Sequence, residues 1–116
     1  MNIQMFGVKN SFDVRKAERF FSERKIKVQY IDLAVKGLSK GELQSVCNAL
    51  GLEALINQQT KNYKKLNMDK ITGAAIREEI LFDNPQLYKT PIVRNGKQAT
   101  VGYVPEIWQT WIEADK

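Results

Sequence analysis

Residues 84–103 read NPQLYKTPIVRNGKQATVGY, and this stretch decides the fold. Ile and Val at 92–93 favour a strand, and the Asn-Gly pair at 95–96 is a strong signal for a two-residue hairpin turn. Residues 99–101 then return antiparallel to the first strand. Pro91 has no N–H to donate to a sheet ladder, so we expect it at the start or the edge of its strand.

The front of the chain indicates a strand, a helix and a second strand. A short apolar run near Ile3 precedes the stripe Val14, Ala17 and Phe21, whose i, i+3, i+7 spacing predicts a helix over about 13–25. The segment KVQYIDL, residues 27–33, is typical of a further strand. Because the connections are short, the two strands are expected to be parallel with a right-handed crossover.

The middle third has helical signals. Ser39 and Glu42 form a capping-box pattern, and Gly51 suits the C-terminal cap of the helix that they begin. The apolar stripe of that helix consists of Leu43, Val46, Cys47 and Leu50. Shorter helical segments are expected near 52–56 and 63–66, and a longer one in TGAAIREEILFDNP ends before its proline.

A terminal helix follows the hairpin. Pro105 suits its first turn. Its expected apolar face consists of Ile107, Trp108, Trp111 and Ile112. The whole order is βαβ, helical insertion over about 39–83, β-hairpin and C-terminal helix. We therefore predict one α/β domain over 1–116, a thioredoxin-like fold with a mixed four-stranded sheet.

Composition excludes several classes of function. The chain has no histidine, one cysteine and a formal net charge of +5. Imidazole bases, histidine zinc sites and an internal disulfide are thereby ruled out, and no metal site is expected. No basic block or nucleic-acid motif is present, so we expect only weak, non-specific binding to nucleic acid. The absence of a long apolar run and of a signal-peptide pattern predicts a cytoplasmic protein that does not enter membranes.

The chain resembles the arsenate reductase-like family, which includes the ArsC reductases and the Spx transcription regulators. Four pieces carry the resemblance in order: GVKNSFDVRKAERFF, YIDL, LINQQTKNYKKL and NPQLYKTPIVRNGKQATVGY. The last is the most specific, because it matches a family pattern of N-P-x-L-x-x-x-P-I-V followed by a hairpin and a glycine. The resemblance implies a thioredoxin-like fold in which Pro91 is the cis-proline that faces the active site.

The resemblance places Ser11 where the family has its nucleophilic cysteine, in a K-N-C motif at the start of a helix. A serine hydroxyl forms no disulfide, and without histidine it has no base to activate it. Ser11 also suits a plain capping role. The binding residues that the resemblance implies are Lys9, Asn10, Arg15, Thr90, Pro91 and Arg94.

Arsenate reductases of the family hold their oxyanion with arginines at three places. In this chain the middle segment INQQTKNY has no arginine, Thr90 precedes the proline, and Tyr103 follows Gly102. A bidentate clamp on arsenate requires guanidinium groups. Arsenate reduction is therefore not expected, even with a thiol at position 11. Cys47 lies on an apolar helical stripe, so we expect it to be a buried core residue and not a displaced nucleophile.

Two functions remain open on the sequence. The first is a non-catalytic binding protein whose ligand is an extended peptide or a glutathione-like thiol, with RNA polymerase as a partner by analogy with Spx. The alternative is a thiol-dependent oxidoreductase of the same family, with glutathione as co-substrate, in which Ser11 replaces a native cysteine artificially. As written, the sequence predicts an inactive enzyme with no resident cofactor.

Overall fold

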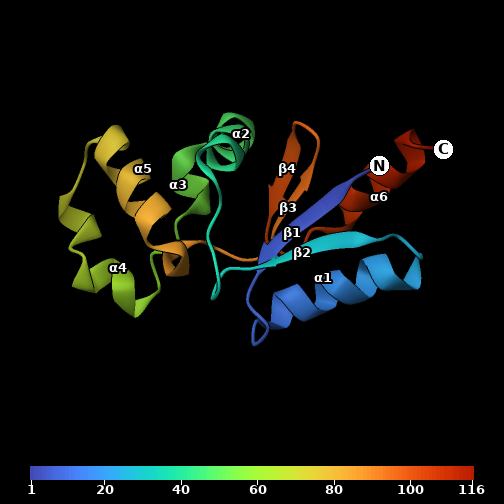
Figure 1. Ribbon diagram of the computed structural model, residues 1–116, viewed down its shortest axis with the longest axis horizontal. Helices are drawn as coiled ribbons and strands as arrows, with labels where there is room; N and C mark the ends of the chain where they lie inside the picture. Colours follow the sequence, from blue (N-terminus) through green and yellow to red (C-terminus); the bar gives the residue numbers. More distant parts are fainter.

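Four strands form one mixed sheet in the order β2-β1-β3-β4 in the computed structural model, which describes residues 1–116 (Figure 1). The strands are β1 (Ile3–Gly7), β2 (Val28–Asp32), β3 (Ile92–Asn95) and β4 (Gln98–Val101). Strand β1 is parallel to β2 and antiparallel to β3, and β3 and β4 form the hairpin. The predicted α/β fold with a mixed four-stranded sheet is confirmed.

The helices follow the predicted order. They are α1 (Phe12–Glu23), α2 (Lys40–Leu50), α3 (Leu52–Leu55), α4 (Lys61–Lys65), α5 (Ala74–Asp83) and α6 (Pro105–Ala114), with 3-10 turns η1 (Met68–Lys70) and η2 (Pro85–Leu87). Helix α1 ends earlier than expected, and Lys25 beyond its end has a φ of 59°. A left-handed residue cannot continue a right-handed helix, so the chain turns there toward β2.

Two apolar layers cover the two faces of the sheet. On one face, α1 and α6 bury a cluster that includes Phe21, Val93 and Trp108. On the other face, helices from the segment between β2 and β3 bury Phe6, Ile31 and the rest of a larger cluster. Figure 1 shows α1 and α6 near the strands, whereas α3, α4 and α5 extend beyond one end of the sheet. The alternation of Met5 and Phe6 between the two layers follows from the two-residue period of a strand.

The predicted helix caps are confirmed, and the predicted burial of one apolar residue is wrong. The Ser39–Glu42 capping box is present, and Gly51 caps α2 with a φ of 85°. Ile107 is 41% exposed, although we expected it on the buried face of α6. The stripe is centred on Trp108, so Ile107, about 100° around the helix, lies at its margin.

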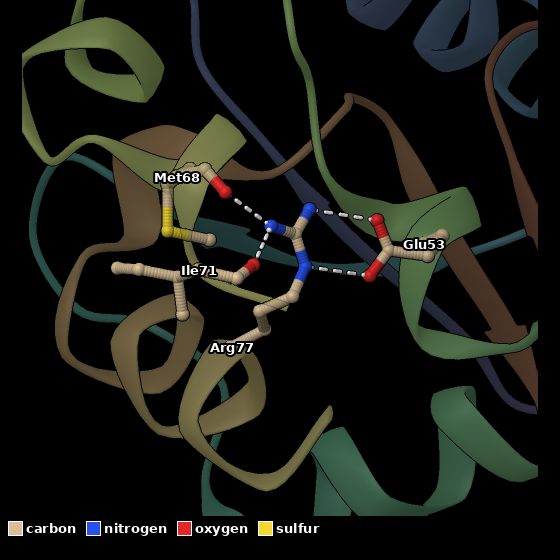
Figure 2. Close-up of polar contacts among 4 residues, drawn as sticks. All are labelled: Glu53, Met68, Ile71 and Arg77. Carbon is tan, nitrogen blue, oxygen red and sulfur yellow. Dashed lines mark hydrogen bonds and ion pairs between the residues drawn. The ribbon is translucent and has the colours of Figure 1, made fainter. Parts of the chain in front are cut away.

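A buried arginine joins three elements of the helical segment (Figure 2). Arg77 of α5 is only 7% exposed and donates to both carboxylate oxygens of Glu53 in α3, at 2.9 and 2.8 Å. It also donates to the main-chain carbonyls of Met68 and Ile71 around η1. All the bonds come from one side chain, so its loss leaves several acceptors without a donor.

Replacing Arg77 by methionine is expected to lower the free energy of unfolding by about 3 kcal/mol, since buried carbonyls lose their donors. Urea unfolding followed by circular dichroism measures the effect. The matched control is Lys65→Met, an exposed lysine of α4, which is expected to change stability by less than about 0.5 kcal/mol. Equal stability of the two variants would contradict the structural role of Arg77.

Candidate functional site

The junction between β1 and α1 is shaped by a close contact. Gly7, the last residue of β1, is buried, and a Cβ built on it would lie 2.7 Å from Cγ2 of Val14. Only glycine therefore permits the first turn of α1 to pack against the end of the strand. The intervening turn is closed by the Ser11 N–H, which donates to the Val8 carbonyl at 3.1 Å.

Ser11 is the N-cap of α1. Its hydroxyl accepts the N–H of Val14 at 3.4 Å, and its carbonyl accepts the N–H of Arg15 at 3.2 Å. The N–H groups of Phe12 and Asp13 have no acceptor within the protein. These free donors and the positive end of the helix dipole favour an acceptor group or an anion at this place.

The chain before β3 lies beside Ser11. Because Ile92 pairs with Phe6 near the end of β1, Pro91 lies next to the junction, and the Thr90–Pro91 peptide bond is cis as predicted. The Thr90 hydroxyl donates to the Ser11 hydroxyl oxygen at 3.4 Å. The main-chain N–H and C=O of Thr90 have no partner within the protein. We call Ser11, Thr90, Pro91 and the amides of Phe12 and Asp13 the Ser11–Thr90 ledge.

Three further residues from the sequence prediction lie at the same junction. Lys9 and Asn10 are exposed on the turn between β1 and α1. Arg15 is exposed on the first turn of α1, with Cζ at 6.0 Å from the centroid of the Phe12 ring. The structure thus brings these side chains to the neighbourhood of Ser11, where Lys9 and Arg15 add positive charge.

The structure does not bring Arg94 to the ledge. Arg94 pairs with Gln4, at the opposite end of β1 from Gly7. Its guanidinium donates to Oε1 of Gln4 at 2.6 Å and to Oγ of Ser45 in α2 at 3.3 Å. The predicted grouping of Arg94 with Ser11 is therefore not formed, because the register of β3 places it on the α2 side of the sheet.

Cys47 is half-buried on α2, not fully buried as expected. Burial, and after it the nearby Glu78 carboxylate, together raise the pKa of its thiol to about 11. The thiol is protonated at neutral pH, where only the thiolate is a nucleophile. This environment supports the prediction that Cys47 is not a displaced catalytic cysteine.

Sequence reasoning missed the aromatic groups around the ledge. Phe12 is 68% exposed directly after Ser11, and Tyr103 follows the hairpin. Lys16 lies between them, with Nζ at 5.2 Å from the Phe12 ring centroid and 4.6 Å from that of Tyr103. The spacing of Phe12 and Lys16 on one helical face was the available signal, whereas the place of Tyr103 depends on packing across the chain.

Two other kinds of site find no support in the structure. No three Cys, Asp or Glu side chains gather where they could hold a metal ion. None of the helices combines the length and the apolar character needed to cross a bilayer.

Comparison with known proteins relates this architecture to one family. The ArsC family, as described by its sequence model, matches residues 6–111. An uncharacterised protein of Haemophilus influenzae is 26% identical over 113 residues, which cover 92% of this chain and 96% of that protein. The global transcriptional regulator Spx of Staphylococcus aureus is 27% identical over 105 residues, covering 87% of this chain and 79% of Spx.

The fold has close structural relatives. An arsenate reductase from Vibrio cholerae superposes with a TM-score of 0.83 at 23% identity, covering 95% of this chain and 97% of that one. At this identity the likeness concerns the fold alone.

Proposed function

This chain belongs to the ArsC family, and we propose that it is a non-catalytic member that binds an extended peptide segment at the Ser11–Thr90 ledge. The observation that carries the proposal is the unpaired main chain of Thr90, whose N–H and C=O both lack a partner within the protein. An extended peptide supplies one acceptor and one donor to such a residue, as in strand addition. None of these bonds requires a thiol.

The serine supports binding over catalysis. Its hydroxyl accepts bonds from Val14 N–H and from the Thr90 hydroxyl, so it holds two sides of the ledge together. No histidine exists in the chain to activate it as a nucleophile. The similarity to Spx, a global transcriptional regulator, supports a partner in regulation. Binding to RNA polymerase stays a prediction. The cytoplasmic location also stays a prediction.

A bulky substitution on the ledge tests peptide binding. A peptide-display library is screened against the protein, and the affinity of an enriched peptide is measured by fluorescence anisotropy. Ser11→Phe is expected to weaken binding at least about tenfold, because the ring covers the free amides of α1. Ser39→Phe is the matched control, because it removes a capping serine from α2 at a similar cost of about 1 kcal/mol without touching the ledge.

Two outcomes would count against the proposal. One is a screen that enriches no peptide. The other is an equal loss of affinity in the Ser11→Phe and Ser39→Phe variants, which would trace the effect to stability and not to the ledge.

A second candidate is a thiol-dependent oxidoreductase with glutathione as co-substrate, in which Ser11 replaces a cysteine. The free N–H groups of Phe12 and Asp13 favour it, because they would stabilise a thiolate at the helix start. Arsenate as substrate is not favoured, since Thr90 and Tyr103 stand at two clamp positions.

Introducing the thiol tests this second candidate. In a Cys47→Ala background, Ser11→Cys is expected to titrate below the reference pKa of about 8.5 and to react with a small disulfide at neutral pH faster than Cys47 does. Ser22→Cys in the same background is the control, because Ser22 is exposed far from the N-terminus of α1. An equal pKa in the two variants would remove the support for thiol chemistry at position 11.

A further inference from the structure

A shallow hollow lies between α1 and the loop that follows β4. Its volume is about 270 Å³, and its walls include Lys16 and Arg19 of α1 and Arg24 directly after its end, with Tyr103 and Pro105 from the loop after β4. We call these five residues the cationic hollow. Three cationic side chains line the hollow, whereas Glu23 is the one carboxylate that lines it, so the hollow has an excess of positive charge.

Two of the cations are held in place by aromatic rings. The Arg24 guanidinium carbon lies 3.7 Å from the Phe20 ring centroid, and the same group donates to the Phe20 carbonyl at 3.0 Å and to Gln109 at 3.4 Å. The Lys16 ammonium lies 4.6 Å from the Tyr103 ring centroid. Cations that are already ordered lose little side-chain entropy when an anion binds.

The one ion pair within reach leaves Lys16 available. Its Nζ is 3.6 Å from the carboxylate of Asp13, and both side chains are well exposed, at 40% and 48%. Exposed pairs of this kind contribute at most about 1 kcal/mol. A carboxylate from a partner can therefore compete for Lys16.

Two contacts link the cationic hollow to residues at the ledge. On α1, Lys16 also lies 5.2 Å from the ring centroid of Phe12, the residue after Ser11. On the hairpin side, Tyr103 follows Gly102, whose N–H donates to the Pro91 carbonyl at 2.9 Å. A segment that pairs with Thr90 can therefore extend into the hollow without leaving the surface.

We propose that the peptide bound at the ledge is acidic, with a carboxylate side chain seated in the cationic hollow. Helix geometry sets the spacing. Ser11 and Arg19 are eight residues apart on α1, or about 12 Å along its axis, which an extended chain covers in about four residues. The carboxylate is accordingly expected two to four residues from the residue that pairs with Thr90. This inference rests on the proposed peptide binding.

The test compares peptide pairs on charge variants. Random eight-residue peptides are displayed and selected against the protein, and each enriched acidic peptide is synthesised with its Glu→Gln analogue. The wild type is expected to bind the acidic peptide at least about tenfold more tightly than the analogue. Lys16→Glu/Arg19→Glu is expected to abolish this difference. Lys27→Glu/Lys36→Glu, at exposed lysines outside the hollow, is the control with the same change in net charge and is expected to keep it.

The outcomes separate the inference from the function on which it rests. Enriched peptides that lack acidic residues but lose affinity in Ser11→Phe would overturn the hollow and leave peptide binding intact. An acidic preference that survives Lys16→Glu/Arg19→Glu would place the charge recognition elsewhere and overturn the inference. A screen with no enriched peptide would overturn both. Should the double glutamate variant not fold, Lys16→Gln/Arg19→Gln replaces it. This variant is expected to prefer the acidic peptide over its analogue by less than the about tenfold of the wild type.

Discussion

The pairing of β1 on both its edges is the constraint on which the rest of the structure depends. Phe6 lies opposite Ile31 of β2 and opposite Ile92 of β3, so the end of β1 is fixed between segments far apart in the sequence. This register brings Thr90 within hydrogen-bond distance of Ser11, across a separation of 79 residues. A slip of one residue would turn the apolar side chains of a strand to the wrong face, so both apolar layers hold the register.

The site that results is built mainly from main-chain groups. The free amides of Phe12 and Asp13 come from the start of α1, and the free N–H and C=O of Thr90 come from the chain before β3. A cysteine at position 11 would add redox chemistry, but it would not change these donors and acceptors. The proposed binding therefore depends on these main-chain groups and not on a reactive atom at position 11.

Local signals predicted the elements, and long-range packing decided the site. The capping box at Ser39 and the place of Pro91 could be predicted because each depends on neighbouring residues. The hairpin was predicted as well, but Asn95 pairs with Gln98, so its two turn residues are Gly96 and Lys97 and not the expected Asn95 and Gly96. The partners of Arg94 and Arg77 could not, because the guanidinium groups bond residues up to 90 and 24 positions away. The sequence shows that these arginines exist, but not which element each one faces.

The same distinction applies to the cationic hollow. The cations of α1 are visible in the sequence as a charged helical face, typical of a solvated surface. Their grouping with Tyr103 requires the loop after β4 to lie against α1, which only the folded structure shows. Cations that the sequence indicates as dispersed along one helix thus share one hollow with Tyr103.

The proposed peptide pairs with the free main chain of Thr90. Amide hydrogen exchange measured by NMR, with and without a saturating display-selected peptide, tests this pairing at the Thr90 N–H. The unpaired Thr90 amide is expected to exchange rapidly in the free protein and at least about tenfold more slowly in the complex, because it gains an acceptor there. The amide of Lys97, at the far end of the hairpin, is expected to exchange at the same rate in both states. Unchanged exchange at Thr90 in a saturated complex would show that the peptide does not pair with this residue.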